Sequence, residues 1–436
     1  MTESYQSAER SEYARVENPD SQQSCQHKDS FLQSGGSRAI QSVGEIFANR
    51  RMAICVVFLS AFSLLFGVLA LSTPLLEWDM LAYVANATIN LTGLPAEDIH
   101  KLVYDQLQAA VPVEDYQRLT GSEARAARAA DPAAFRQTIG FFYDARIVYI
   151  GLLGTLMQLG MDPFFASYFI STISVIICIF LLASLLPGTL PYGVCFSLPF
   201  VVFSCGLFEL ARFSTPDALA ALFTVVLYWS LMRNGWYLLL LLPVSVFVRT
   251  DLIILAAIFQ GYLLLTARFP RILVVISGLA TIACYLLLNN YIVDGDPWSS
   301  LIGYNFGEKP VYTEDYTFVV TFKNYLSYIA EGLRTFSYEP RFFMFGFMVI
   351  SGLIMFSARL FYYPNERISI RHQNMLFILV SSILYIGAHF MLFPVNWVRF
   401  YAAHYAIVVV VVLWAAMILL AQRNYQVDGQ RETVKT

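Results

Sequence analysis

The chain is poor in charged residues, and no cysteine pattern points to a disulfide framework or a metal site. Charged residues make up 14% of the 436 positions, whereas an average soluble protein has about 25%. The net charge of −3 lacks the basic excess of a nucleic-acid-binding protein, so no nucleic-acid partner is expected. The cysteines form no C-x-x-C pair, and only the first lies outside an apolar run: Cys25, Cys55, Cys178, Cys195, Cys205 and Cys284.

The N-terminal segment lacks both apolar runs and a short leader. Residues 1–50 are rich in Ser, Gln and Glu and contain few aliphatic side chains. Such a segment cannot bury enough apolar surface to fold alone, so we expect a disordered cytoplasmic tail. The first apolar run begins at Met52, which favours a retained signal anchor over a cleaved signal peptide.

Apolar residues, in contrast, are abundant. They make up 57% of the chain, and the mean hydropathy is +0.58. The sequence therefore predicts an all-α, polytopic membrane protein with about ten transmembrane helices, each of about 20 residues, in a domain over residues 51–422. The fifth predicted span is short and contains Pro243. The spans are expected near residues 52–71, 164–186, 189–208, 214–232, 235–249, 251–267, 271–293, 341–361, 374–393 and 400–421.

Basic residues in the short loops orient these spans through the positive-inside rule. With the N-terminus in the cytoplasm, every short basic loop is cytoplasmic; these loops hold Arg50, Arg51, Arg233, Arg268, Arg271, Arg359, Arg367, Arg371 and Arg423. Residues 423–436 then form a cytoplasmic tail, and exported loops cover about residues 72–163 and 294–340. Within the first loop we expect an exposed helix over residues 121–135. We also expect an interfacial helix over residues 147–159, a stretch too short to span comfortably.

Two carboxylates flank a tryptophan directly after the first span, in the sequence Glu77-Trp78-Asp79. A carboxylate at the outer membrane surface can take a proton from an acceptor hydroxyl as a general base. The pair can equally bind a divalent cation. The alternative is structural, because acidic residues also favour the first turn of a helix.

Three short outward loops each hold one arginine at the same predicted membrane level: Arg212, Arg249 and Arg399. The guanidinium fork suits phosphate, so together they predict a bound anion. Asp217 follows Arg212 and Asp251 follows Arg249, so both loops also carry an acid. The alternative is three unrelated contacts with the surface or with lipid headgroups.

Other polar residues lie close to apolar segments. Asp144 and Arg146 precede the predicted interfacial helix, where they either bind substrate or pair with each other or with headgroups. His389 and His404 lie inside apolar helices. A lone intramembrane histidine more often makes a hydrogen bond between helices than acts as a catalyst.

The region from about residue 51 to residue 422 resembles the GT-C superfamily of integral membrane glycosyltransferases. The resemblance is carried by the first span followed by Glu77-Trp78-Asp79 and Tyr83, by the loop end over residues 143–159, and by Asp217 before a later helix. It implies that Asp79 is the catalytic carboxylate, with Glu77 as the second acid. The family's adjacent acidic residue is displaced here to Glu77, across Trp78.

The resemblance also implies a reaction and further residue roles. The expected activity moves a hexosyl or pentosyl group from a polyprenyl-phosphate donor to a glycan, lipid or protein acceptor, with inversion. Arg249, Arg399 and Arg212 are the expected donor-phosphate residues, and a substrate-binding role falls to Asp217, Asp144, Arg146, Tyr83 and Asp251. The expected location is a bacterial plasma membrane, among membrane lipid, with the site extracytoplasmic. A transporter or lipid flippase of cell-envelope intermediates is the alternative.

Overall fold

The computed structural model describes residue 50 and residues 52–185, 192–292, 302–303, 305–306, 320–362, 370–395 and 397–433. Helices account for nearly all of this part of the chain, and it contains no strand; one isolated β-bridge joins Leu75 to Phe213. Residues 55–436 form one compact unit. The predicted disordered tail lies outside the described residues except for Arg50, as does most of residues 293–319 in the second predicted exported loop.

Four helices are long and apolar enough to cross a membrane. They are Met52–Ser72, α8 (Pro163–Ser184), α14 (Arg271–Tyr291) and the part His372–Leu392 of α18 (Ile370–Leu392). Their outer faces carry exposed large apolar side chains; Leu64 is 72% exposed and Leu279 is 62% exposed. Exposed apolar surface of this extent suits lipid contact, and these helices indicate a membrane protein.

The other six predicted spans also form helices, with described apolar parts of 10–17 residues. These apolar parts are shorter than the roughly 20 residues of a full span, so the predicted count of ten spans stays a prediction. Pro243 lies inside the fifth of the predicted spans, as expected, in an eleven-residue helix. The six are α9 (Tyr192–Ser204), α11 (Asp217–Met232), α12 (Leu238–Val248), α13 (Leu252–Thr266), α17 (Pro340–Tyr362) and α19 (Ala402–Thr433).

One predicted boundary is wrong. The helix of the third predicted span, expected to run to about residue 208, ends at Ser204, and a second helix, α10 (Leu207–Arg212), begins after Gly206. Gly206 has φ +84°, and a Cβ there would lie 3.3 Å from the Nη1 atom of Arg341, so both backbone conformation and space favour glycine. At the other end of the chain, α19 continues to Thr433, so the predicted tail from residue 423 is helical up to that residue.

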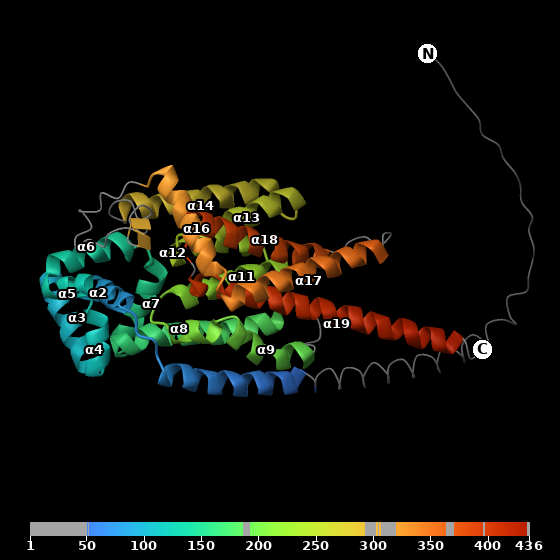
Figure 1. The fold of residues 1–436 in the computed structure, drawn as a ribbon, viewed down its shortest axis with the longest axis horizontal. Helices are drawn as coiled ribbons and strands as arrows, with labels where there is room; N and C mark the ends of the chain where they lie inside the picture. The colour runs from blue at the N-terminus through green and yellow to red at the C-terminus, as the bar shows by residue number, and fades with distance from the viewer. Residues whose placement is uncertain are drawn as a thin grey trace, which may run out of the picture. The chain divides into compact units, whose positions relative to one another are not determined.

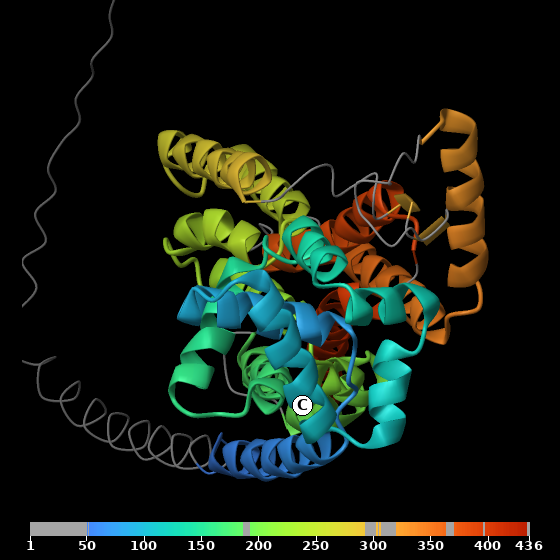
Figure 2. The ribbon, with the colours of Figure 1, turned by 90° about the vertical axis from the view of Figure 1, so that its left-hand side faces the viewer.

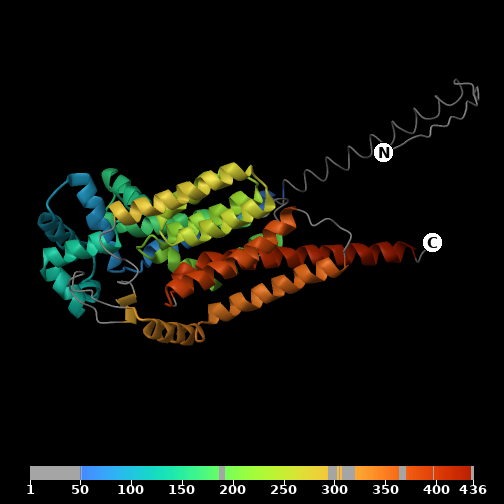
Figure 3. The ribbon, with the colours of Figure 1, turned by 90° about the horizontal axis from the view of Figure 1, so that it is seen from above.

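The helices of the first predicted exported loop gather at one end of the long helices (Figures 1 and 3). We call α2–α6 the cap. Each of the helices α3–α6 follows a proline, serine or aspartate, residues that favour helix starts, and α7 leads from the cap back to α8. The helices are α2 (Asp79–Thr92), α3 (Ala96–Ala110), α4 (Val113–Thr120), α5 (Glu123–Ala130), α6 (Pro132–Phe142) and α7 (Ile147–Gln158).

The cap has its own core around α2, whose residues from Met80 to Thr88 are all buried. The prediction of one exposed helix over residues 121–135 is wrong. That stretch forms α5 and the start of α6, separated at Asp131, and both Arg128 and Phe135 are buried. The predicted interfacial helix is α7; it packs against α2 and α8.

The described part of the second predicted loop contains one amphipathic helix, α16 (Phe322–Phe336). Figure 2 shows it at the margin of the helices, away from the cap. Phe322 is exposed on it, whereas Phe336 is buried against Phe390.

Candidate functional site

Two distant loops are tied together where the cap meets the long helices. The Leu75 N–H donates to the Arg212 carbonyl at 2.8 Å, and the Glu77 N–H donates to the Ser214 hydroxyl at 3.2 Å. Arg118 of α4 donates to the Leu76 carbonyl at 3.2 Å. These bonds bring the first turn of α2 close to the first turn of α11, and therefore bring the two predicted acidic motifs to one place.

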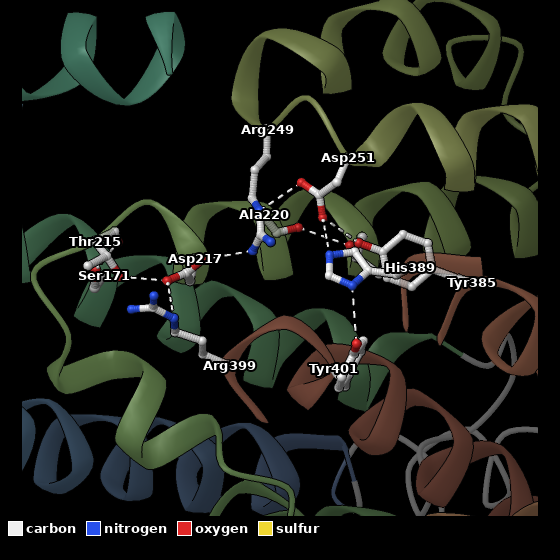
Figure 4. Close-up of polar contacts among 11 residues, drawn as sticks. Ser171, Thr215, Asp217, Ala220, Arg249, Asp251, Tyr385, His389, Arg399 and Tyr401 are labelled. Atoms are coloured by element: carbon white, nitrogen blue, oxygen red, sulfur yellow. Dashed lines mark hydrogen bonds and ion pairs between the residues drawn. The ribbon is translucent and has the colours of Figure 1, made fainter. Parts of the chain in front are cut away.

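Asp217, in the first turn of α11, accepts bonds from three elements (Figure 4). Its Oδ1 lies 2.7 Å from Nη1 of Arg249, and its Oδ2 lies 3.4 Å from Nε of Arg399. The Thr215 hydroxyl donates to Oδ2 at 2.8 Å. The Ser171 hydroxyl of α8 in turn donates to the Thr215 backbone carbonyl. Two of the three arginines predicted to share a level thus meet on one carboxylate.

Arg249 is buried between two carboxylates. Its Nε lies 2.8 Å from Asp251 Oδ1, in addition to the Asp217 contact, and the guanidinium carbon lies 3.9 Å from the centre of the Phe400 ring. The positive charge of Arg249 is therefore neutralised by two carboxylates, and the guanidinium fixes the positions of both.

The network continues from Asp251 into α18 (Figure 4). Asp251 Oδ2 accepts from the Tyr385 hydroxyl at 2.9 Å and lies 3.2 Å from His389 Nε2. The other ring nitrogen of His389 lies 3.1 Å from the Tyr401 hydroxyl. Asp251 therefore contacts a guanidinium on one oxygen and two groups of α18 on the other.

Arg399 connects this network to the cap. Its side chain is 18% exposed, compared with 8% for Arg249, and it lies 4.6 Å from the Trp397 ring centre. Burial acts to lower the pKa of Arg399, but Asp217 and then Asp79 outweigh it and raise the pKa. Arg399 is therefore within electrostatic range of both Asp217 and Asp79, and it is the more accessible of the two cations.

Asp79 is the first residue of α2 and its N-cap is Trp78, so Asp79 lies in the first turn of the helix. Its Oδ1 accepts from the Tyr143 hydroxyl at 2.7 Å. The Tyr143 ring packs edge-on against Tyr83 at 5.1 Å. Among the residues that the structure describes, no partner of Oδ2 is found. Asp79 therefore has one oriented oxygen and one available oxygen.

Glu77 is the second acid of the motif and is half-buried. Burial raises its pKa, and the nearby Asp79 adds to the effect; the positive charges of Arg399, Arg125 and Arg118 act in the opposite direction. The two acids therefore differ, since Tyr143 holds Asp79 by a direct bond whereas Glu77 is anchored through its backbone.

Three predicted site residues lie apart from this cluster or at its edge. Arg212 donates to the Thr73 carbonyl and lies 5.4 Å from the Phe208 ring centre. Asp144 lies 4.0 Å from Arg136. Arg146 precedes α7 and acts as a nearby positive charge on Tyr83 and Asp251. Arg146 therefore belongs to the edge of the site.

The part of the chain that the structure describes contains no group of three or more His, Cys, Asp or Glu side chains placed to hold a metal ion. Glu77 and Asp79 are thus two carboxylates without a third protein ligand of these types among the described residues. The structure gives the predicted divalent cation no further support.

No family model matches the chain, and no match is found among curated proteins or solved structures. The resemblance to GT-C glycosyltransferases therefore depends on the short motifs and on the predicted topology alone. Function is argued below from the geometry of the site.

Proposed function

We propose that this chain is an integral membrane glycosyltransferase that moves a sugar from a polyprenyl-phosphate donor to an acceptor hydroxyl. In this proposal the chain crosses a bacterial plasma membrane about ten times, with both termini in the cytoplasm and the cap outside. The main support is that Asp79 and Arg399 lie near one another without forming an ion pair. A half-buried carboxylate with one available oxygen lies within electrostatic range of a partly exposed guanidinium, which is what proton removal and phosphate departure require.

The proposed step is a direct displacement. The acceptor oxygen attacks the anomeric carbon of the sugar while Asp79 takes the hydroxyl proton. The bond between that carbon and the phosphate oxygen breaks, and its electron pair leaves with polyprenyl phosphate. A positioned base contributes roughly 10²–10⁴-fold to such a step. A single displacement inverts the anomeric configuration.

Arg399 is the proposed contact to the leaving phosphate. Negative charge develops on the phosphate during departure, and a fixed guanidinium in a partly dry site stabilises it. Arg249 is more deeply buried and already balanced by Asp217 and Asp251, so we assign it the role of holding Asp217 and thereby Arg399. The sequence-based expectation that Arg249 binds the phosphate directly is thus replaced in this proposal.

A lipid-linked donor follows from the proposed orientation. Nucleotide sugars are confined to the cytoplasm, so an extracytoplasmic enzyme needs a carrier that crosses the membrane. The aromatic surfaces of Tyr83 and Tyr143 beside Asp79 offer a stacking face for a sugar ring. Glu77 is assigned a hydrogen bond to the bound sugar or acceptor.

One observation favours the alternative of a transporter or lipid flippase. The ion network runs from Asp251 to His389 within the apolar helix α18, and charges inside membrane helices often mark transport pathways. Movement of a labelled polyprenyl-phosphate sugar across reconstituted vesicles, without any sugar transfer, would support this alternative.

The test is a transfer assay on the full chain reconstituted in vesicles with a labelled polyprenyl-phosphate sugar and an envelope glycan extract. We expect Asp79→Asn to lower the transfer rate about 10²–10⁴-fold at unchanged protein abundance. The matched control is Asp105→Asn, an exposed carboxylate of α3 in the same cap, which should keep the wild-type rate. Equal rates in the two variants would remove Asp79 as the base.

A further inference from the structure

Arg128 of α5 is a buried arginine that forms no ion pair with any described residue. It is 3% exposed, and its Nε has no hydrogen-bond partner among these residues. The guanidinium lies 5.3 Å from the centre of the Trp78 ring. A buried charge without a carboxylate partner is strongly unfavourable, and the ring offers only partial compensation.

Two further buried donors beside Arg128 make no hydrogen bond of ordinary geometry to any described residue. They are the Trp78 indole N–H and the Tyr104 hydroxyl. Burial raises the pKa of Tyr104, whereas a contact between its hydroxyl and the Trp78 indole N–H, together with the charge of Arg128, acts to lower it, so all three donors lie close together. Phe135 closes the group, with ring centres 6.0 Å from Trp78 and 5.3 Å from Tyr104. The group therefore contains three donors, and its one acceptor is the Tyr104 hydroxyl oxygen.

The two neighbouring arginines of the cap differ from Arg128. Arg118 of α4 and Arg125 of α5 both lie within electrostatic range of Glu77, and Arg118 also pairs with Asp115 at 2.9 Å. Arg125 donates to the Arg118 carbonyl. A guanidinium with neighbouring N–H and O–H donors and no carboxylate among the described residues suits a phosphate or carboxylate better than a neutral group.

We propose that Arg128, Trp78 and Tyr104 form an oxyanion site that binds a phosphate or carboxylate group carried by the acceptor. Trp78 lies between Glu77 and Asp79 in the chain, and its ring faces the cap whereas Asp79 contacts Tyr143. An acceptor held by its anionic group in the cap can therefore present a hydroxyl to Asp79. The identity of the ligand as acceptor rests on the proposed function; anion binding at Arg128 does not.

Anion binding is tested on the full chain in detergent by thermal unfolding with inorganic phosphate or acetate, at ionic strength held constant with chloride. A ligand that binds only the native state raises the Tm, and we expect a rise of about 2 °C or more at saturation. Arg128→Met should abolish the rise. Arg125→Gln, on the same helix, and Asp79→Asn should both keep it.

The Arg128→Met variant without added anion separates a binding role from a structural one. If the site exists to bind, removing its unpaired buried charge leaves the Tm unchanged or higher. A lower Tm together with an unchanged phosphate response would overturn the proposal. No Tm response of the wild-type chain to either anion would overturn it as well.

The acceptor assignment is tested by transfer kinetics with an anionic acceptor and its methyl ester. We expect Arg128→Met to raise KM for the anionic acceptor about tenfold or more, at nearly unchanged kcat, and to leave KM for the ester and for the donor unchanged. A raised donor KM instead would assign the anion to the donor. If anion binding depends on Arg128 but no sugar transfer occurs, the proposed function is refuted and the anion site at Arg128 is still supported.

Discussion

Two buried arginines among the described residues have opposite surroundings. Arg249, at the end of the long helices, is held by Asp217 and Asp251 and covered by Phe400. Arg128, in the cap, has the Trp78 ring beside it and no carboxylate among the described residues. Balanced charges fix geometry because every partner depends on the others, whereas an unbalanced buried charge has capacity for a ligand. The comparison separates a structural network from a candidate binding site.

The largest effect is expected from a substitution that removes Arg249 from its two carboxylate partners. Arg249→Met removes the closest cation of both Asp217 and Asp251 and leaves them only the longer contacts to Arg399 and His389, so the free energy of unfolding should fall by about 3–5 kcal/mol. Chemical unfolding of the detergent-solubilised chain measures this change. Arg128→Met serves as the matched comparison, since it removes an unpaired charge and should leave the free energy of unfolding unchanged or higher. Similar losses in the two variants would refute the contrast drawn above.

The second prediction concerns Arg399, which belongs to the same network but remains partly accessible. Arg399→Ala should lower kcat/KM for sugar transfer about 10²–10³-fold, because the leaving phosphate loses its cation. Its effect on unfolding should be well below that of Arg249→Met. Kinetics and unfolding on the same preparation measure both. A large stability loss with unaltered transfer per folded molecule would assign Arg399 a structural role.

The third prediction concerns the bond that orients Asp79. Tyr143→Phe removes the hydroxyl donor while keeping the ring that packs against Tyr83. A bond to a charged group contributes about 1.5–3 kcal/mol, so kcat should fall by roughly tenfold or more. Tyr116→Phe, on α4, is the control and should leave kcat unchanged. An unaltered kcat in Tyr143→Phe would show that Asp79 is oriented without this bond.

The smallest expected effect is a pH dependence at Glu77. Its raised pKa means that ionised Glu77 is less favourable in the folded chain than in the unfolded chain. The stability that protonated Glu77 gives the folded chain is therefore fully present below the ordinary pKa of 4.5. It is lost as the pH rises through the raised pKa of the folded chain. Glu77→Gln should gain stability relative to wild type over that rise, in Tm scans against pH. Glu97→Gln, exposed on α3, should show no such trend.

Much of the helical framework follows from the sequence because apolar runs mark buried or lipid-facing helices regardless of their neighbours. The sequence also predicted that Arg249 and Arg399 lie near one another, because the positive-inside rule places both in loops on the same side of the membrane, and both contact Asp217. Arg212 lies in a third such loop but donates to Thr73. A shared predicted side therefore does not show which side chains meet.

The cap was the least predictable region. Residues around Arg128 are rich in Ala, Arg and Glu, a composition that indicates an exposed helix, and only the folding of α5 onto Trp78 buries the arginine. The contact between Tyr143 and Asp79 joins residues far apart in the chain, and no local periodicity indicates it. His389 was noted as an isolated histidine, and its partners Asp251 and Tyr401 come from other elements.

The bond between Leu75 and Arg212 has a consequence for how the proposed base is held. Together with the Glu77–Ser214 bond, it fastens the start of α2 to the turn before α11. Glu77 and Ser214 are 137 residues apart in the chain. A change in the turn before α11 is therefore expected to displace Asp79, although that turn lies outside the cap.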